Sequence, residues 1–124
     1  MMEQGKVIAK EYHHNGKLKF LYREVNRDDV DHMEIIVKRY YKSGQIKEEE
    51  GWFFGNMYGS EWYENGQIRL KYHSYNDPTT DVSEKKWNKN GVLIKCRTSS
   101  EEGSVLKEWN SKGKLIKDIM LSYE

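Results

Sequence analysis

The sequence predicts an all-β protein: a single antiparallel sheet, a meander of about ten strands built from five β-hairpin repeats. Three observations support this prediction. An aromatic-x-x-x-Gly-x-(Leu/Ile) signature occurs five times in the 124 residues. The flanking stretches are alternating or β-branched, as strands are. No long stretch shows helical periodicity. The chain, 1–124, is therefore interpreted as one repeat domain.

The repeat is anchored on glycines that stand four residues after an aromatic residue and two residues before an aliphatic one. The glycines are Gly16, Gly44, Gly66, Gly91 and Gly113; the aromatics are Tyr12, Tyr40, Trp62, Trp87 and Trp109; the aliphatics are Leu18, Ile46, Ile68, Leu93 and Leu115. Successive glycines are 28, 22, 25 and 22 residues apart, so the basic period is 22 residues. The longer first and third intervals predict insertions near Asp28 and Asp77.

Each signature has the composition of a tight turn between two strands. Asn15-Gly16, Asn65-Gly66 and Asn90-Gly91 are the preferred pair for a type I′ turn, whose central residues both need φ > 0. A basic residue follows the aliphatic position in the first three copies: Lys19, Lys47 and Arg69. Because a lone two-stranded hairpin is marginally stable, the copies must stack edge to edge into one sheet.

The composition indicates a thin structure with much exposed surface. Hydrophobic residues make up 36% and charged residues 33% of the chain, with 9 Tyr and 4 Trp against 3 Phe. Tyr and Trp combine an apolar body with a polar tip, which suits half-buried faces. A compact two-layer core is therefore not expected.

Charge and cysteine content set expectations for partners and location. Lys and Arg number 21 and Asp and Glu 20, a balance that gives no case for a nucleic-acid partner. Cys96 is the single cysteine, so no internal disulfide can form, which is typical of the cytoplasm. The first residues lack the apolar core of a signal peptide, and no run of 18 apolar residues predicts a membrane-spanning helix. We expect a cytoplasmic protein.

The best-conforming copies resemble a known repeat. Tyr40-Tyr41-Lys42-Ser43-Gly44-Gln45-Ile46, followed by Gly55-Asn56-Met57-Tyr58-Gly59 and Trp62-Tyr63-Glu64-Asn65-Gly66-Gln67-Ile68-Arg69, is similar to the bacterial variant of the MORN (membrane occupation and recognition nexus) repeat. The resemblance runs from about Tyr12 to Lys117 and loosens in the last two copies. It implies an elongated twisted sheet that acts as a binding or scaffolding surface.

The same resemblance suggests a function. Bacterial proteins made wholly of this variant include YwqK-type antitoxin or immunity proteins, which are similar to this chain in size. The resemblance therefore implies that the chain binds and neutralises a cognate toxin protein, encoded by the adjacent gene. The alternative is a scaffold or membrane-associated interaction module. Basic residues after several turns could face anionic lipid, but interleaved acids largely cancel them, so a membrane partner is not expected.

The residues provide no catalytic constellation. His13, His14, His32 and His73 lack the spacing of metal ligands, and Cys96 has no nearby partner cysteine. The glycines recur at turns and form no phosphate-binding loop. We therefore expect a non-enzymatic protein with no cofactor and no metal.

Candidate partner-binding residues lie where the sequence departs from its repeat. The aromatic group comprises Trp52, Phe53, Phe54 and Tyr58; the acidic group, which could oppose a basic toxin, comprises Glu48, Glu50, Asp77, Asp81, Glu101 and Glu102. In a strand, Trp52 and Phe54 face one side and Phe53 the other. The aromatic run has two interpretations: it fills the thin core between repeats, or it is an exposed anchor for a partner.

Overall fold

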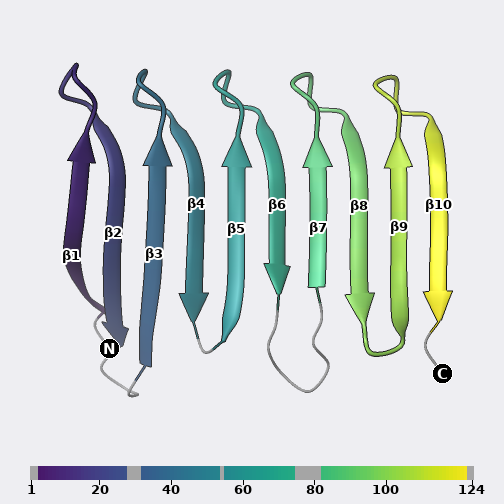
Figure 1. Cartoon of the computed structure of the whole chain (residues 1–124), viewed down its shortest axis with the longest axis horizontal. Coiled ribbons are helices and arrows are strands. Elements are labelled where there is room, and N and C mark those ends of the chain that lie inside the picture. The colour runs from purple at the N-terminus through teal and green to yellow at the C-terminus, as the bar shows by residue number, and fades with distance from the viewer. Residues whose placement is uncertain (1–2, 28–31, 54, 75–81, 123–124) are drawn as a thin grey trace.

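The computed structural model is all-β, and it describes residues 3–27, 32–53, 55–74 and 82–122. Its ten strands form one antiparallel sheet in which every strand pairs with its sequence neighbours, in the order β1 to β10 (Figure 1). The strands are β1 Glu3–Tyr12, β2 Leu18–Arg27, β3 His32–Tyr40, β4 Ile46–Phe53, β5 Asn56–Trp62, β6 Ile68–Ser74, β7 Val82–Trp87, β8 Leu93–Ser100, β9 Gly103–Trp109 and β10 Leu115–Ser122. The predicted ten-stranded meander is confirmed.

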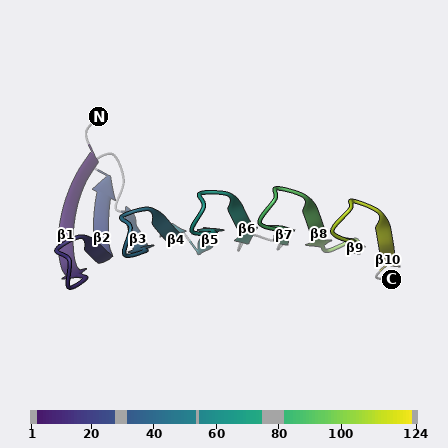
Figure 2. The ribbon, with the colours of Figure 1, turned by 90° about the horizontal axis from the view of Figure 1, so that it is seen from above.

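The five signature turns lie along one edge of the sheet, here called the turn edge, and the β8–β9 turn lies at the opposite edge (Figure 1). The sheet stays open, so β1 and β10 each have one unpaired edge. Figure 2 shows that the β1–β2 hairpin is inclined to the rest of the sheet. Accumulated strand twist, which follows from backbone sterics, bends a long open sheet in this way.

The signature turns differ from the predicted type. The amide of Gly16 donates to the carbonyl of His13 at 2.9 Å, and the amide of His13 donates to the carbonyl of Lys17 at 2.8 Å. The same two bonds recur in all five copies. The glycine is thus the fourth residue of the turn, with φ between 85° and 98° across the copies. A three-residue loop of this kind, a turn followed by a left-handed residue, replaces the predicted two-residue type I′ turn.

Asparagine stabilises these turns through its side chain. Asn15 Oδ1 accepts the amide of Lys17 at 3.0 Å, and Asn65 Oδ1 accepts the amide of Gln67 at 2.9 Å. In the fourth turn the acceptor is Asn88, whose Oδ1 takes the amides of Asn90 and Val92. Short polar side chains of this kind cap turns without a positive φ of their own.

A β-bulge follows every signature turn. In the third repeat Trp62 pairs with Ile68, whereas Glu61 pairs with Leu70, so Arg69 is an extra residue on its strand. The equivalent register shift occurs in all five hairpins, and the extra residues are Lys19, Lys47, Arg69, Ile94 and Ile116. A bulge redirects its side chain, and in the first three copies that side chain is basic.

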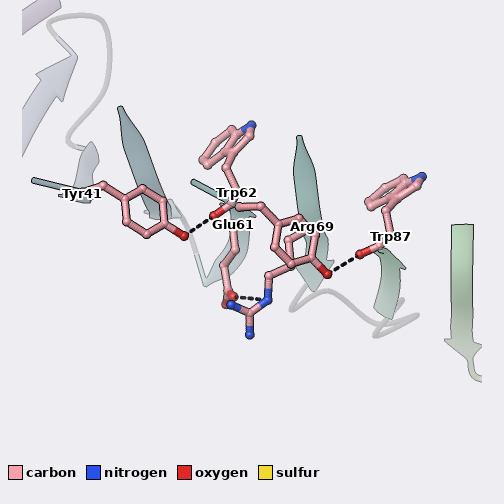
Figure 3. A network of polar contacts seen from close by, with 6 residues as sticks. Tyr41, Glu61, Trp62, Arg69 and Trp87 are labelled. Atoms are coloured by element: carbon pink, nitrogen blue, oxygen red, sulfur yellow. Dashed lines mark hydrogen bonds and ion pairs between the residues drawn. The ribbon is translucent and has the colours of Figure 1, made fainter. Parts of the chain in front are cut away.

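Hydrogen bonds along the turn edge join one repeat to the next. Tyr41 Oη donates to the carbonyl of Trp62 at 2.7 Å, and Tyr63 Oη donates to the carbonyl of Trp87 at 2.8 Å (Figure 3). At the first junction, His13 Nε2 donates to the carbonyl of Tyr40 at 3.0 Å. All three donors occupy the position after the signature aromatic. In the fourth repeat this position is Asn88, whose side chain bonds within its own turn.

The sheet has almost no enclosed core. Val37, which is 8% exposed, is the one buried hydrophobic side chain among the described residues. Two tyrosine rings pack on glycines: Tyr58 lies opposite Gly51 and Tyr72 opposite Gly59. A Cβ at either glycine would lie 2.1 Å or 2.5 Å from the facing ring. These rings fill the space that each glycine leaves on its face of the sheet.

Candidate interaction surfaces

The two faces of the sheet differ in chemistry. Residues paired across strands share a face, and successive residues of a strand alternate between faces. Trp62, Trp87 and Trp109 lie on one face, here called the tryptophan face, while Glu48, Glu61, Glu84 and Glu108 lie on the other, the glutamate face. Figure 3 shows the rings of Trp62 and Trp87 on the side opposite Glu61 and Arg69.

Cations accompany the acids of the glutamate face. The nitrogen–oxygen distances are 3.2 Å for Arg39–Glu48, 3.8 Å for Arg69–Glu61, 3.7 Å for Lys95–Glu84, 3.9 Å for Arg97–Glu84 and 4.0 Å for Lys117–Glu108. These pairs are partly exposed, so each contributes about 0–1 kcal/mol. Their main effect is to neutralise charge locally. The cations that they neutralise include Arg69, Lys95 and Lys117, which follow signature turns.

At the turn edge, cations also lie against tyrosine rings. The Lys47 ammonium is 5.6 Å from the centroid of Tyr41, and the Arg69 guanidinium is 5.8 Å from that of Tyr63. Both cations are bulge residues. Burial raises the pKa of Tyr41; Arg69 lowers it, and Glu64, Glu48 and Glu61 raise it further. Tyr41 therefore remains a neutral hydrogen-bond donor at neutral pH.

Two of the predicted acids come together with a predicted aromatic residue. Glu48, Glu50 and Trp52 alternate along β4 and so share the glutamate face. Glu61 of β5 lies directly opposite Glu48, and Tyr72 of β6 lies on Gly59, the residue opposite Glu50. We call these five residues, Glu48, Glu50, Trp52, Glu61 and Tyr72, the acidic patch.

The carboxylates of the acidic patch affect the pKa of Tyr72. Burial raises the pKa of Tyr72, and the carboxylates of Glu50, Glu61 and Glu48 raise it further. Glu48 and Glu61 have arginine partners. Glu50 forms none of the ion pairs found among the described residues, so it leaves a net negative charge at the centre of the patch. The sequence prediction missed Glu61 and Tyr72, which the strand register places beside Glu50.

The other predicted site residues are dispersed. Phe53 follows Trp52 on β4 and therefore lies on the opposite face, the tryptophan face. Tyr58, 38% exposed, shares that face, and its hydroxyl donates to Glu34. The aromatic run thus does not form one patch. Glu101 and Glu102 lie exposed in the β8–β9 turn, with three strands between β4 and β8. Phe54, Asp77 and Asp81 lie outside the described residues.

The last strand is the most apolar exposed element. All eight residues of β10 are exposed. Its large hydrophobic side chains are exposed by 44% at Leu115, 62% at Ile116, 41% at Ile119, 75% at Met120 and 56% at Leu121. Sequence analysis did not single out this strand. The signal was its position: among the second strands of the five described hairpins, β10 alone pairs on one edge and not on both.

Two kinds of feature are absent from the described part of the chain. It has no group of three or more His, Cys, Asp or Glu side chains placed to hold a metal ion. It also has no helix with the length and apolar character that a membrane crossing requires. Cys96 is half-buried on β8.

Comparison with known families supports the repeat. The MORN repeat variant matches residues 7–22 and 33–51. These segments cover the first turn with parts of β1 and β2, and the second turn with most of β3 and β4. No curated protein matches the chain. The same turn, bulge and register continue through the third, fourth and fifth hairpins. The chain is thus a stack of similar hairpins, of which the first two match the MORN repeat variant, and such repeats suggest a repeat-based interaction module.

Proposed function

We propose that this sheet of MORN-variant hairpins is a non-catalytic protein-binding module that engages its partner through the acidic patch. More specifically, we propose an immunity protein, or antitoxin, which binds and neutralises a cognate toxin protein encoded by the adjacent gene. It would act in the cytoplasm, where its single cysteine stays reduced.

The observation that carries the proposal is the openness of both faces. With Val37 the one buried hydrophobic side chain among the described residues, neither face is covered by a second layer. Most side chains that would form a core in a globular domain are half-buried here and remain accessible. Surfaces that combine accessible apolar area with charge are typical of protein–protein interfaces.

The acidic patch suits a basic partner. Glu50 supplies an uncompensated charge, while Trp52 and Tyr72 provide aromatic area of the kind that anchors interfaces. Complementary charge speeds encounter and excludes wrong partners. A toxin domain that acts on nucleic acid carries a basic surface, and an inhibitor gains most by covering that surface.

The experiment is co-expression with the product of the adjacent gene, read out as protection from toxicity and as co-purification of a one-to-one complex. Glu50→Lys is expected to weaken the complex by about tenfold or more, since it replaces attraction by repulsion at the patch. Glu101→Lys makes the same charge change in the exposed β8–β9 turn and is expected to leave affinity unchanged.

Three outcomes would count against the proposal. Absence of protection and of a complex removes the immunity function. A complex unaffected by Glu50→Lys removes the acidic patch as the interface. Loss of binding in Glu101→Lys with retention in Glu50→Lys places the interface at the β8–β9 turn.

The exposed apolar strand β10 favours a second candidate, a scaffold module that assembles through the edge of its sheet. An edge strand presents unpaired amides and carbonyls to any incoming strand. The membrane-associated form of this alternative is tested by flotation with anionic vesicles at low salt. Binding that is lost as salt is raised supports it, and no binding at low salt excludes it.

A further inference from the structure

Strand β10 lacks the neighbour that every equivalent strand has. The second strands of the first four hairpins, β2, β4, β6 and β8, pair on their outer edge with the next hairpin. Strand β10 has the same place in the fifth hairpin, but among the described residues its outer edge pairs with no strand. Its apolar residues, Ile119, Met120 and Leu121, are exposed as a consequence. Natural proteins usually protect such edges with charges or short strands.

The four junctions between repeats share one register. In each, the second residue after the signature aliphatic lies opposite the residue before the next signature aromatic. The four pairs are Phe20–Arg39, Glu48–Glu61, Leu70–Lys86 and Lys95–Glu108. The next pair at each junction is Leu21–Lys38, Glu49–Ser60, Lys71–Lys85 and Cys96–Lys107.

The same register can be continued from β10 onto strand β1 of a second copy. It places Lys117 opposite Glu11 of that copy, Asp118 opposite Lys10, and Ile119 opposite Ala9. Each of the two charged pairs, Lys117–Glu11 and Asp118–Lys10, then joins opposite charges. No inner junction has this property, and two of them oppose like charges, Glu48–Glu61 and Lys71–Lys85. Opposite charges directly across a strand pair stabilise it.

The apolar ends are complementary as well. Tyr12 is 58% exposed and Leu115 is 44% exposed, although the inner signature aromatics and aliphatics are half-buried. Each of the two lies on an outer strand of the sheet, which has a neighbouring strand on one side only. In the continued register Tyr12 of the second copy lies one residue beyond the Lys117–Glu11 pair, at the same end of the contact as Leu115.

We propose that a second copy of this chain docks on β10 through its own β1, so that the repeat array continues head to tail from molecule to molecule. This contact is heterologous, because β10 and β1 are different surfaces, and such contacts generate open chains of subunits. The pairing uses only strand edges. Both faces, including the acidic patch, stay open to another partner.

The test is sedimentation velocity of the intact chain over a concentration series at low salt. Wild-type protein is expected to form species larger than a monomer as concentration rises. Lys10→Asp and Asp118→Lys each place like charges across the contact and are expected to weaken association by about tenfold. Glu102→Lys and Lys42→Asp make the same charge changes in exposed turns and are expected to associate like wild type.

Mixing the two edge variants gives the decisive result. Asp118→Lys presents a lysine that matches the new aspartate of Lys10→Asp. The unchanged Asp118 of the Lys10→Asp variant also matches the unchanged Lys10 of the Asp118→Lys variant. The equimolar mixture is therefore expected to associate at concentrations where each variant alone stays monomeric. Far-UV circular dichroism of each variant verifies that the sheet is intact.

Contrary results are equally clear. A wild-type chain that stays monomeric throughout the series overturns the proposal. Association that Asp118→Lys weakens and Lys10→Asp leaves unchanged means that β10 pairs with β10 of a two-fold-related copy, and it excludes the head-to-tail contact. A mixture that remains monomeric excludes it too.

Discussion

The hydrogen bond from Tyr63 to the carbonyl of Trp87 gives a quantitative prediction about how the repeats are joined. Tyr63→Phe removes the hydroxyl, which lies 2.8 Å from the carbonyl oxygen in a half-buried setting, and keeps the ring. A hydrogen bond of this kind contributes about 1 kcal/mol net to folding. For a chain of this length that corresponds to a fall of about 4 °C in Tm.

Urea unfolding followed by tryptophan fluorescence measures this loss, with Tyr12→Phe as the matched control because Tyr12 is 58% exposed at the end of the sheet. Tyr41→Phe removes the equivalent bond at the preceding junction. The double variant is expected to lose about 2 kcal/mol, because the two bonds share no partner. If Tyr63→Phe is as stable as Tyr12→Phe, the hydroxyl does not join the repeats and the reasoning is wrong.

Two further predictions concern single positions. Gly103→Ala places a Cβ 2.1 Å from the carbonyl oxygen of Leu121 at a φ of 152°, so we expect the free energy of unfolding to fall by about 1–3 kcal/mol in urea denaturation. The control Gly16→Ala adds a Cβ in open space at a φ of 86° and should lower the free energy of unfolding by about 1 kcal/mol. Equal losses in the two variants would refute the clash at Gly103. Burial and the carboxylates of Glu50, Glu61 and Glu48 raise the pKa of Tyr72 above 10.0, so the unfolded chain ionises first. The stabilisation from this tyrosine is therefore complete below the unfolded pKa and is lost as pH rises through the folded pKa. Tyr72→Phe should reduce the fall in urea midpoint between about pH 9 and pH 11, and an unchanged fall would contradict this.

The fold could be predicted from the sequence because the repeat determines almost all of the fold. Five glycines with fixed aromatic and aliphatic neighbours determine five turns, and stacking of hairpins follows from their marginal individual stability. The turn type was wrong. Asn15 and Asn65 precede a glycine as in a type I′ turn, but their side chains cap a three-residue loop instead. Composition alone does not separate these turns, since both favour asparagine and glycine.

The candidate site was predicted only in part. Alternation along one strand predicted that Phe53 faces away from Trp52, as it does in the structure. The shared face of Glu48, Glu50 and Trp52 follows from the same alternation but was not predicted. Neither Glu61 nor Tyr72 could be found without the register between strands, which the bulge at Arg69 shifts by one residue. The exposure of β10 depends on its unpaired outer edge rather than on any local motif, so no pattern within the strand predicted it.

Hydroxyl-radical footprinting of the free chain, read out by mass spectrometry, tests the central claim that both faces of a single-layer sheet are open. Tyr58 reports on the tryptophan face and Tyr72 on the glutamate face. We expect both tyrosines, and Trp62, Trp87 and Trp109, to be oxidised at the rates of half-exposed side chains. Strong protection of all the reporters on one face would show that a second layer covers it, and would contradict the account.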